Sequence, residues 1–135
     1  MTFQLRTRRK GDKQHEQATI RILIVDDHPV VRAGLATLLR SQRDLQIEGG
    51  VNSAEEALAF LENKPVDVVL LDLRMPKTTG LEALPQIVGR AHSPRVLILS
   101  SFDYEEEIYR SAMAGASGYL IRARPARRFL KLSAR

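Results

Sequence analysis

Short apolar segments alternate with longer amphipathic segments along this chain, and the alternation limits the folds open to it. Runs of four apolar residues, rich in valine and isoleucine, are typical of strands buried on both faces. Segments with apolar residues three and four positions apart indicate helices, and Leu35, Leu38 and Leu39 fall on one such face. We predict strands at residues 21–25, 45–51, 66–71, 96–99 and 119–121.

Each predicted strand is followed by a segment with helical periodicity. Ser53 and Glu56, like Thr79 and Glu82, have the spacing of a capping box, in which a hydroxyl and a carboxylate bind the first free amides of a helix. Pro85 lies inside the third predicted helix and should weaken or kink it. Five strands that alternate with five helices predict an α/β fold, with a parallel sheet covered on both faces and right-handed connections.

The net charge of +5 belongs to the two ends of the chain. Residues 1–19 have a net charge of +3 and residues 122–135 of +6, whereas residues 20–121 have −4. We expect a basic flexible arm at 1–19, because no apolar periodicity is present there. One domain then covers 20–135, and its last helix, at 125–135, is short and basic. Such ends attract nucleic acid or another anionic partner, or they form a solvated tail and an amphipathic helix.

The composition excludes several classes of site and location. The chain has no cysteine, which excludes disulfides, thiolate metal sites and cysteine nucleophiles. Its longest apolar run has five residues, whereas a membrane helix needs about 20. The basic start is not followed by an apolar segment, so no secretory signal is expected. We therefore expect a cytoplasmic protein with no membrane partner.

Polar side chains follow four of the predicted strands, at the edge where ligands bind in open parallel sheets. They are Asp26, Asp27, Asp72, Ser100 and Arg122. Three nearby carboxylates repel one another, so either a cation such as Mg²⁺ binds among them or one takes up a proton. The hydroxyl and the guanidinium also suit a phosphoryl group. Asp72 would then be the nucleophile that forms an acyl phosphate.

Each of these residues also has a plain structural explanation. Asp27 alone would cap the first helix, and Ser100 would bond to backbone. His28 is followed by Pro29, so we place it at the entrance of the helix rather than among metal ligands. The functional interpretation depends on finding three acids, a hydroxyl and a cation together at the ends of four predicted strands.

Four segments resemble the receiver domain of bacterial two-component response regulators. They are Ile24-Val-Asp-Asp-His-Pro29, Leu71-Asp-Leu-Arg-Met-Pro76, Leu99-Ser-Ser101 and Ala114-Gly-Ala-Ser-Gly-Tyr-Leu120. The first, the last and Gly80-Leu-Glu-Ala83 are similar to the NarL/FixJ branch. The resemblance covers about residues 20–122. It implies a flavodoxin-like, doubly wound sheet of five strands in the order 2-1-3-4-5 with five helices.

The resemblance also implies a role for each residue of the acidic set. Asp72 matches the aspartate that accepts the phosphoryl group. Asp26 and Asp27 match the acidic pair that holds Mg²⁺ together with Asp72 and the backbone carbonyl of Arg74. The only chemistry expected is the protein's own phosphorylation and dephosphorylation, so it would not be an enzyme acting on other molecules.

The switch and the partners are implied in the same way. Ser100 matches the hydroxyl that turns toward the phosphoryl group, and Tyr119 matches the aromatic ring that moves inward on activation. Arg122 stands where the family has lysine, which predicts altered phosphorylation because the two side chains differ in shape. The donor would be a sensor histidine kinase or a small acyl phosphate. Receivers often pair through their output face, so a homodimer is one expected state.

The last segment departs from the family pattern. Receivers of this branch continue into a helix-turn-helix DNA-binding domain, and nothing after Arg122 resembles one. Contact with DNA for transcription control would then need a domain absent from this chain. Three alternatives stay open: a nucleic-acid binder that uses its basic ends, an interaction module impaired in phosphorylation, and an enzyme with an aspartyl-phosphate intermediate.

Overall fold

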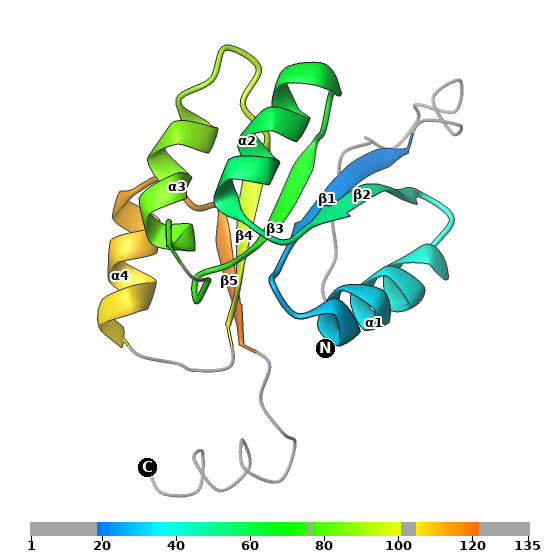
Figure 1. Ribbon diagram of the computed structural model, residues 1–135, viewed down its shortest axis with the longest axis horizontal. Coiled ribbons are helices and arrows are strands. Elements are labelled where there is room, and N and C mark those ends of the chain that lie inside the picture. Colours follow the sequence, from blue (N-terminus) through cyan, green and yellow to red (C-terminus); the bar gives the residue numbers. More distant parts are fainter. Residues whose placement is uncertain (1–18, 76, 101–104, 122–135) are drawn as a thin grey trace, which may run out of the picture.

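The computed structural model describes residues 19–75, 77–100 and 105–121, and within them the chain forms a five-stranded parallel sheet. Neighbouring strands follow the order β2-β1-β3-β4-β5, as predicted (Figure 1). The strands are β1 (Ile20–Val25), β2 (Leu45–Val51), β3 (Val68–Asp72), β4 (Arg95–Ser100) and β5 (Gly118–Ile121). The third strand begins at Val68 rather than at Val66, and the other strands lie close to their predicted positions.

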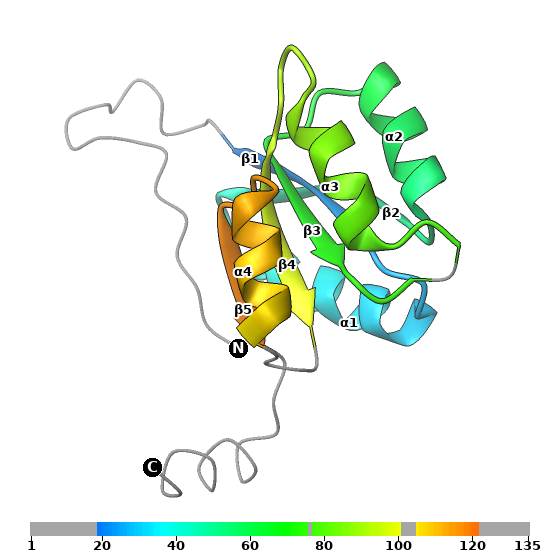
Figure 2. The ribbon, with the colours of Figure 1, turned by 90° about the vertical axis from the view of Figure 1, so that its left-hand side faces the viewer.

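Helices cover both faces of the sheet. They are α1 (Pro29–Arg40), α2 (Ala54–Asn63), α3 (Gly80–Val88) and α4 (Glu105–Met113). Helix α1 lies on one face, α2 and α3 lie on the other, and α4 runs beside α3 (Figures 1 and 2). The basic arm before Thr19 and the predicted fifth helix, at 125–135, lie outside the described residues.

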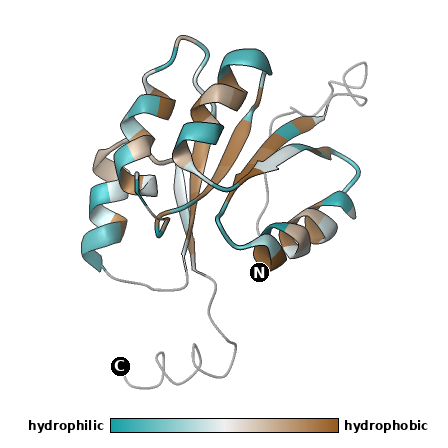
Figure 3. Ribbon diagram, viewed as in Figure 1, coloured by the Kyte–Doolittle hydropathy of each residue, from teal (hydrophilic) through white to brown (hydrophobic). Residues whose placement is uncertain are grey.

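Two apolar clusters, one on each face, attach these helices to the sheet. The larger joins β1, β3 and β4 to α2 and α3, with Leu84 and Ile87 of α3 fully buried. The smaller holds α1 through Leu35 and Leu39. Figure 3 shows strongly apolar central strands, flanked by helices in which polar and apolar residues are mixed. Leu38, predicted on the buried face of α1, is 51% exposed.

The helix starts follow the predicted capping chemistry, with one difference. Thr79 forms a complete capping box with Glu82 at the start of α3. At α2 the hydroxyl of Ser53 accepts the amide of Glu56, but the Glu56 carboxylate accepts the amide of Asn52 instead of that of Ser53. Helix α3 continues past Pro85 to Val88, so the proline does not end it. Both caps begin helices on the face that holds the larger cluster.

The amino-terminal ends of β1 and β3 are joined by a bidentate ion pair. The guanidinium of Arg21 donates to both carboxylate oxygens of Asp67 at 3.0 Å, and the Arg21 amide donates at 2.8 Å. These bonds hold the pKa of Asp67 below its usual range. The pair fixes two adjacent strands at the edge of the sheet opposite the candidate site.

Replacing Asp67 by asparagine should lower the free energy of unfolding by about 1 kcal/mol at neutral pH, since solvent screens a pair this exposed. The two side chains are 39% and 38% exposed. Because the folded-state pKa is lowered, the pair stabilises the protein above the unfolded pKa of about 3.9 and stops doing so as the pH falls through the folded value. Urea denaturation in neutral and acidic buffer measures this difference.

Glu106→Gln is the matched control, because Glu106 pairs with Arg110 on the exposed surface of α4. Its expected effect on unfolding lies within about 0.5 kcal/mol at either pH. If Asp67→Asn were less stable than the wild type by the same amount in neutral and acidic buffer, the prediction would be contradicted.

Candidate functional site

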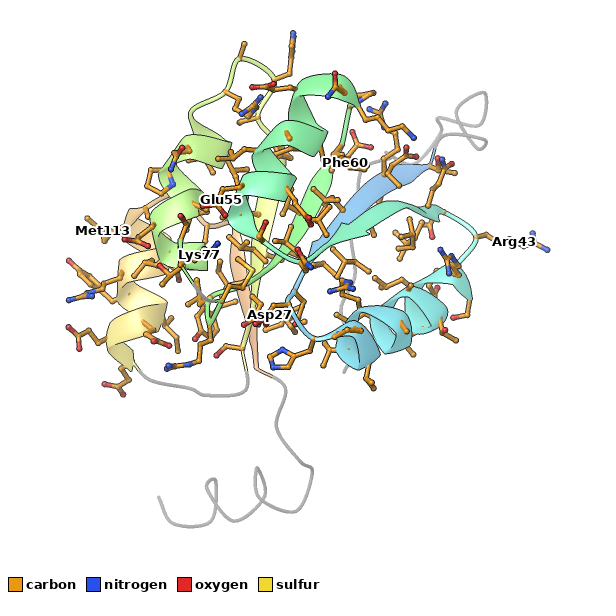
Figure 4. The ribbon with its side chains drawn as sticks, in the orientation of Figure 1. Asp27, Arg43, Glu55, Phe60, Lys77 and Met113 are labelled. Carbon is orange, nitrogen blue, oxygen red and sulfur yellow. The ribbon has the colours of Figure 1, made fainter. Side chains whose placement is uncertain are left out.

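Three carboxylates meet at the carboxyl edge of the sheet. Asp26 and Asp27 follow β1 directly, and Asp72 is the last residue of β3. These strands are neighbours, with Val25 paired to Leu71 in register. One ligand atom each from the three aspartates and His28 lies within 4.8 Å of the others. Figure 4 shows Asp27 just beyond the end of β1, between that strand and the start of α1. The predicted acidic set therefore comes together.

The chemistry of this cluster fits a small cation. Asp26 and Asp72 are only 1% and 5% exposed, so water screens their charges poorly. The buried Oδ2 of Asp26 accepts no hydrogen bond within the described part of the chain, and the buried Oδ1 of Asp27 has the ring nitrogen of His28 as its neighbour. A buried carboxylate oxygen without a partner costs free energy, and a hard divalent ion with oxygen ligands removes that cost.

His28 supplies a ring nitrogen close to the carboxylates, a partner that the prediction had not included. It lies at the entrance of α1, as expected, but its side chain makes no capping bond there. Instead Nδ1 lies 2.9 Å from Oδ1 of Asp26 and 3.0 Å from Oδ1 of Asp27. The hydrogen bond to Asp26 and the charge of Asp27 raise the pKa of His28. The spacing Asp-Asp-His was the only signal in the sequence, and helix geometry alone did not predict the direction of the ring.

The start of α1 also holds Asp26 in place. The amide of His28 donates to Oδ1 of Asp26 at 2.9 Å, and the guanidinium of Arg32 donates to the carbonyl of Asp26 at 2.6 Å. Both donors belong to the first residues of α1 or its entrance. The segment between β1 and α1 is therefore held at Asp26 by two hydrogen bonds from the residues that follow it.

The loop after β3 ties Asp72 to two helices. The amide of Arg74 donates to Oδ1 of Asp72 at 3.1 Å, and its guanidinium pairs with Glu107 of α4 at 2.8 Å. The amide of Gly80, the first residue of α3, donates to the carbonyl of Leu73 at 3.1 Å. Movement of this loop at Asp72 would therefore displace the ion pair with the first turn of α4.

The same loop is bound to α2. Thr78 donates its hydroxyl to the carboxylate of Glu55 in the first turn of α2. This bond and the charge of Lys77 lower the pKa of Glu55. Figure 4 shows Glu55 and Lys77 close together on that side of the molecule. Three helices thus restrain the loop that follows the central carboxylate.

Comparison with known proteins identifies the fold and its family. Residues 22–132 match the model of the response regulator receiver domain. The chain belongs to the response regulator receiver family. It is 37% identical over 109 residues to the response regulator protein VraR of Staphylococcus aureus, covering 81% of this chain and 52% of that protein. It is 33% identical over 103 residues to the transcriptional regulatory protein YxjL of Bacillus subtilis, covering 76% and 47%.

A solved structure supports the same assignment. The two-component response regulator of the LuxR family from Aurantimonas sp. SI85-9A1 is similar with a TM-score of 0.74 and 30% identity, over 87% of this chain and 84% of that one. The receiver chain spans about half the length of the curated relatives it matches. Among the described residues, no helix combines the length and apolar character needed to cross a membrane.

The remaining predicted site residues lie on β4 and β5 or beyond them. Ser100 ends β4, is buried, and pairs in register with Ile121. Tyr119 of β5 is half-buried and contacts the larger apolar cluster. Arg122 lies outside the described residues, so its predicted place near Asp72 stays a prediction. The carbonyl of Arg74 likewise stays a predicted ligand, next to an amide that already binds Asp72.

Proposed function

We propose that this receiver accepts a phosphoryl group on Asp72 and passes the change to a protein-interaction surface. The observation that supports this most directly is the meeting of Asp26, Asp27 and Asp72 at one edge of the sheet, with ligand atoms within 4.8 Å. Membership of the response regulator receiver family supports the same conclusion. The donor is a sensor histidine kinase or a small acyl phosphate.

The proposed step forms an acyl phosphate. One carboxylate oxygen of Asp72 bonds to phosphorus while the bond from phosphorus to the donor's histidine nitrogen breaks. The electron pair of that bond stays on the nitrogen, and the ring leaves as neutral imidazole because its second nitrogen carries a proton. Asp72 is suited to this role because the amide of Arg74 orients one of its oxygens, so the carboxylate is held in a fixed direction.

Charge neutralisation is the main requirement of this transfer, because a carboxylate must approach an anionic phosphoryl group. The residues that would hold Mg²⁺ are Asp26, Asp27, Asp72 and the carbonyl of Arg74. Bound there, Mg²⁺ would screen the carboxylates from the phosphoryl oxygens. Ser100 would donate its hydroxyl to a second oxygen, and Arg122 would pair with a third.

The output is proposed to run through the loop and α4. A phosphoryl group on Asp72 brings negative charge next to Arg74, whose guanidinium pairs with Glu107 of α4. Competition for that guanidinium would loosen α4, and movement of Ser100 would make room for the ring of Tyr119. Control of transcription belongs to the same proposal, because the relative YxjL is described as a transcriptional regulatory protein.

Incubation with acetyl phosphate and Mg²⁺, followed by intact-mass measurement, tests the proposal. We expect one added phosphoryl group on the wild-type protein and none on Asp72→Asn, because the amide is not a nucleophile of comparable strength. Omitting Mg²⁺, or adding a chelator, should lower the wild-type yield at least about tenfold.

Asp67→Asn is the matched control, because Asp67 lies beyond the opposite end of β3 and binds Arg21. It should take up the phosphoryl group like the wild type. If none of the proteins gained this mass, the proposal would fail. The better explanation would then be an interaction module that is impaired in phosphorylation. Equal labelling of wild type and Asp72→Asn would assign the acceptor to another residue.

A further inference from the structure

His28 places a ring nitrogen among the three carboxylates of the acidic site. Its Nδ1 lies 2.9 Å from an oxygen of Asp26, 3.0 Å from one of Asp27 and 4.0 Å from one of Asp72. No other histidine among the described residues belongs to this cluster. The ring thus faces the same three carboxylates that a bound cation would face.

The spacing of these atoms suits ligands of one ion. In an octahedral site, two ligands that are each about 2.1 Å from a first-row divalent ion lie about 3 Å apart when adjacent and about 4.2 Å apart when opposite. The three Nδ1 distances, from 2.9 to 4.0 Å, fall in this interval. The widest separation allowed within the cluster, 4.8 Å, exceeds it only slightly. The His28 side chain is 61% exposed and has room for the small movement needed.

A second observation points to a ligand at this place. The carboxylate of Asp26 is almost completely buried, yet its Oδ2 has no hydrogen-bond partner within the described residues. Its other oxygen already accepts both the amide and the ring nitrogen of His28. The imidazole is not needed as a helix cap, because it makes no capping bond at α1. Its position is therefore explained by the cluster and not by the helix.

We propose that His28 is a nitrogen ligand of this metal site, which therefore takes divalent transition ions such as Co²⁺ and Ni²⁺ in addition to Mg²⁺. The proposal rests on the proposed function, because the same carboxylates are assigned to Mg²⁺. Imidazole nitrogen favours Co²⁺, Ni²⁺ and Zn²⁺, whereas Mg²⁺ prefers oxygen ligands and retains water. His28 should therefore contribute strongly to transition-ion affinity and little to Mg²⁺ affinity.

Isothermal titration of wild type and His28→Ala with Co²⁺, Ni²⁺ and Mg²⁺, in buffer of about pH 8 to favour the deprotonated imidazole, tests this difference. In His28→Ala the dissociation constants for Co²⁺ and Ni²⁺ should rise at least about tenfold, and that for Mg²⁺ should change less than about twofold. Proton NMR of the Co²⁺ form should show a hyperfine-shifted imidazole signal that His28→Ala lacks.

His92→Ala is the matched control, because His92 is exposed between α3 and β4. It should bind all three ions like the wild type. Circular dichroism of each variant verifies the fold, and the loss of a side chain without a capping bond should leave α1 intact.

The outcomes separate this inference from the proposed function. Equal Co²⁺ affinity in wild type and His28→Ala, with normal Mg²⁺ binding and phosphorylation of Asp72, would overturn the role of His28 alone. Tighter Mg²⁺ binding in His28→Ala with unchanged Co²⁺ affinity would also overturn it, since the ring would then compete with the ion. Failure of every ion to bind the wild type would overturn both proposals.

Discussion

Asp26→Asn is expected to abolish the stabilisation of the protein by Mg²⁺ and to raise the stability of the metal-free protein. The substitution removes one of three carboxylate charges from a cluster whose ligand atoms lie within 4.8 Å. The asparagine Oδ1 can still accept the amide of His28, and Nδ2 replaces an oxygen that has no partner among the described residues. The shape is kept while the repulsion falls.

The expected gain follows from Coulomb's law. Two unit charges about 4 Å apart repel by ~4 kcal/mol at an effective dielectric constant of 20. His28 and relaxation of the exposed groups offset part of this, so we expect a gain of about 1–2 kcal/mol in the metal-free free energy of unfolding. The wild type should gain ~1.4 kcal/mol at a Mg²⁺ concentration ten times its dissociation constant, and the variant nothing.

Urea denaturation with and without Mg²⁺ measures both effects in one experiment. Asp44→Asn is the control, because Asp44 lies in the loop between α1 and β2, away from the cluster. It should leave both the metal-free stability and the response to Mg²⁺ unchanged. A metal-free Asp26→Asn less stable than wild type would mean that the Asp26 charge serves the fold through His28, and would sink the prediction.

The sheet and the acidic cluster were predictable because both depend on local patterns. The strand that ends at Asp72 is apolar up to that residue, and the strand that precedes Asp26 is apolar except for Arg21. Parallel strands place their carboxyl ends at one edge, so residues after the strands meet without further information. The capping box at Thr79 was predictable for the same reason, since its partner Glu82 lies three residues away.

The features that were missed depend on contacts between distant elements. Helical periodicity assigns Leu38 to an apolar face but does not say how much of that face the sheet covers, and the residue is 51% exposed. The ion pair of Arg74 with Glu107 joins residues 33 positions apart. The ring of His28 turns to the carboxylates because they offer two acceptors, whereas the helix start offers none that it uses. Such choices are decided by the assembled site.

Gly80→Ala is expected to destabilise the receiver and to displace Asp72. Gly80 is the first residue of α3, and a Cβ atom there would clash with the carbonyl oxygen of Asp72 and lie 2.8 Å from Cα of Leu73. Both are backbone atoms, so no side-chain rotation relieves the contact. The backbone that positions the carboxylate must move.

Overpacking of this kind costs about 1–3 kcal/mol, and the better helix propensity of alanine returns about 0.5–1 kcal/mol. We therefore expect a net loss of about 1–2 kcal/mol in the free energy of unfolding. Phosphorylation by acetyl phosphate should slow by about tenfold or more, since the geometry of the attacking oxygen controls the rate. Urea denaturation and a time course of intact mass measure the two effects.

Gly34→Ala separates this mechanism from a general effect of glycine replacement. Gly34 lies within α1, and a Cβ atom there would have no neighbour within 4 Å. Alanine should therefore stabilise the protein by about 0.5–1 kcal/mol and leave the rate of phosphorylation unchanged. The same chemical change should thus act with opposite signs in two helices. If Gly80→Ala also kept the wild-type rate, the close approach of α3 to the Asp72 carbonyl would have no part in positioning the acceptor.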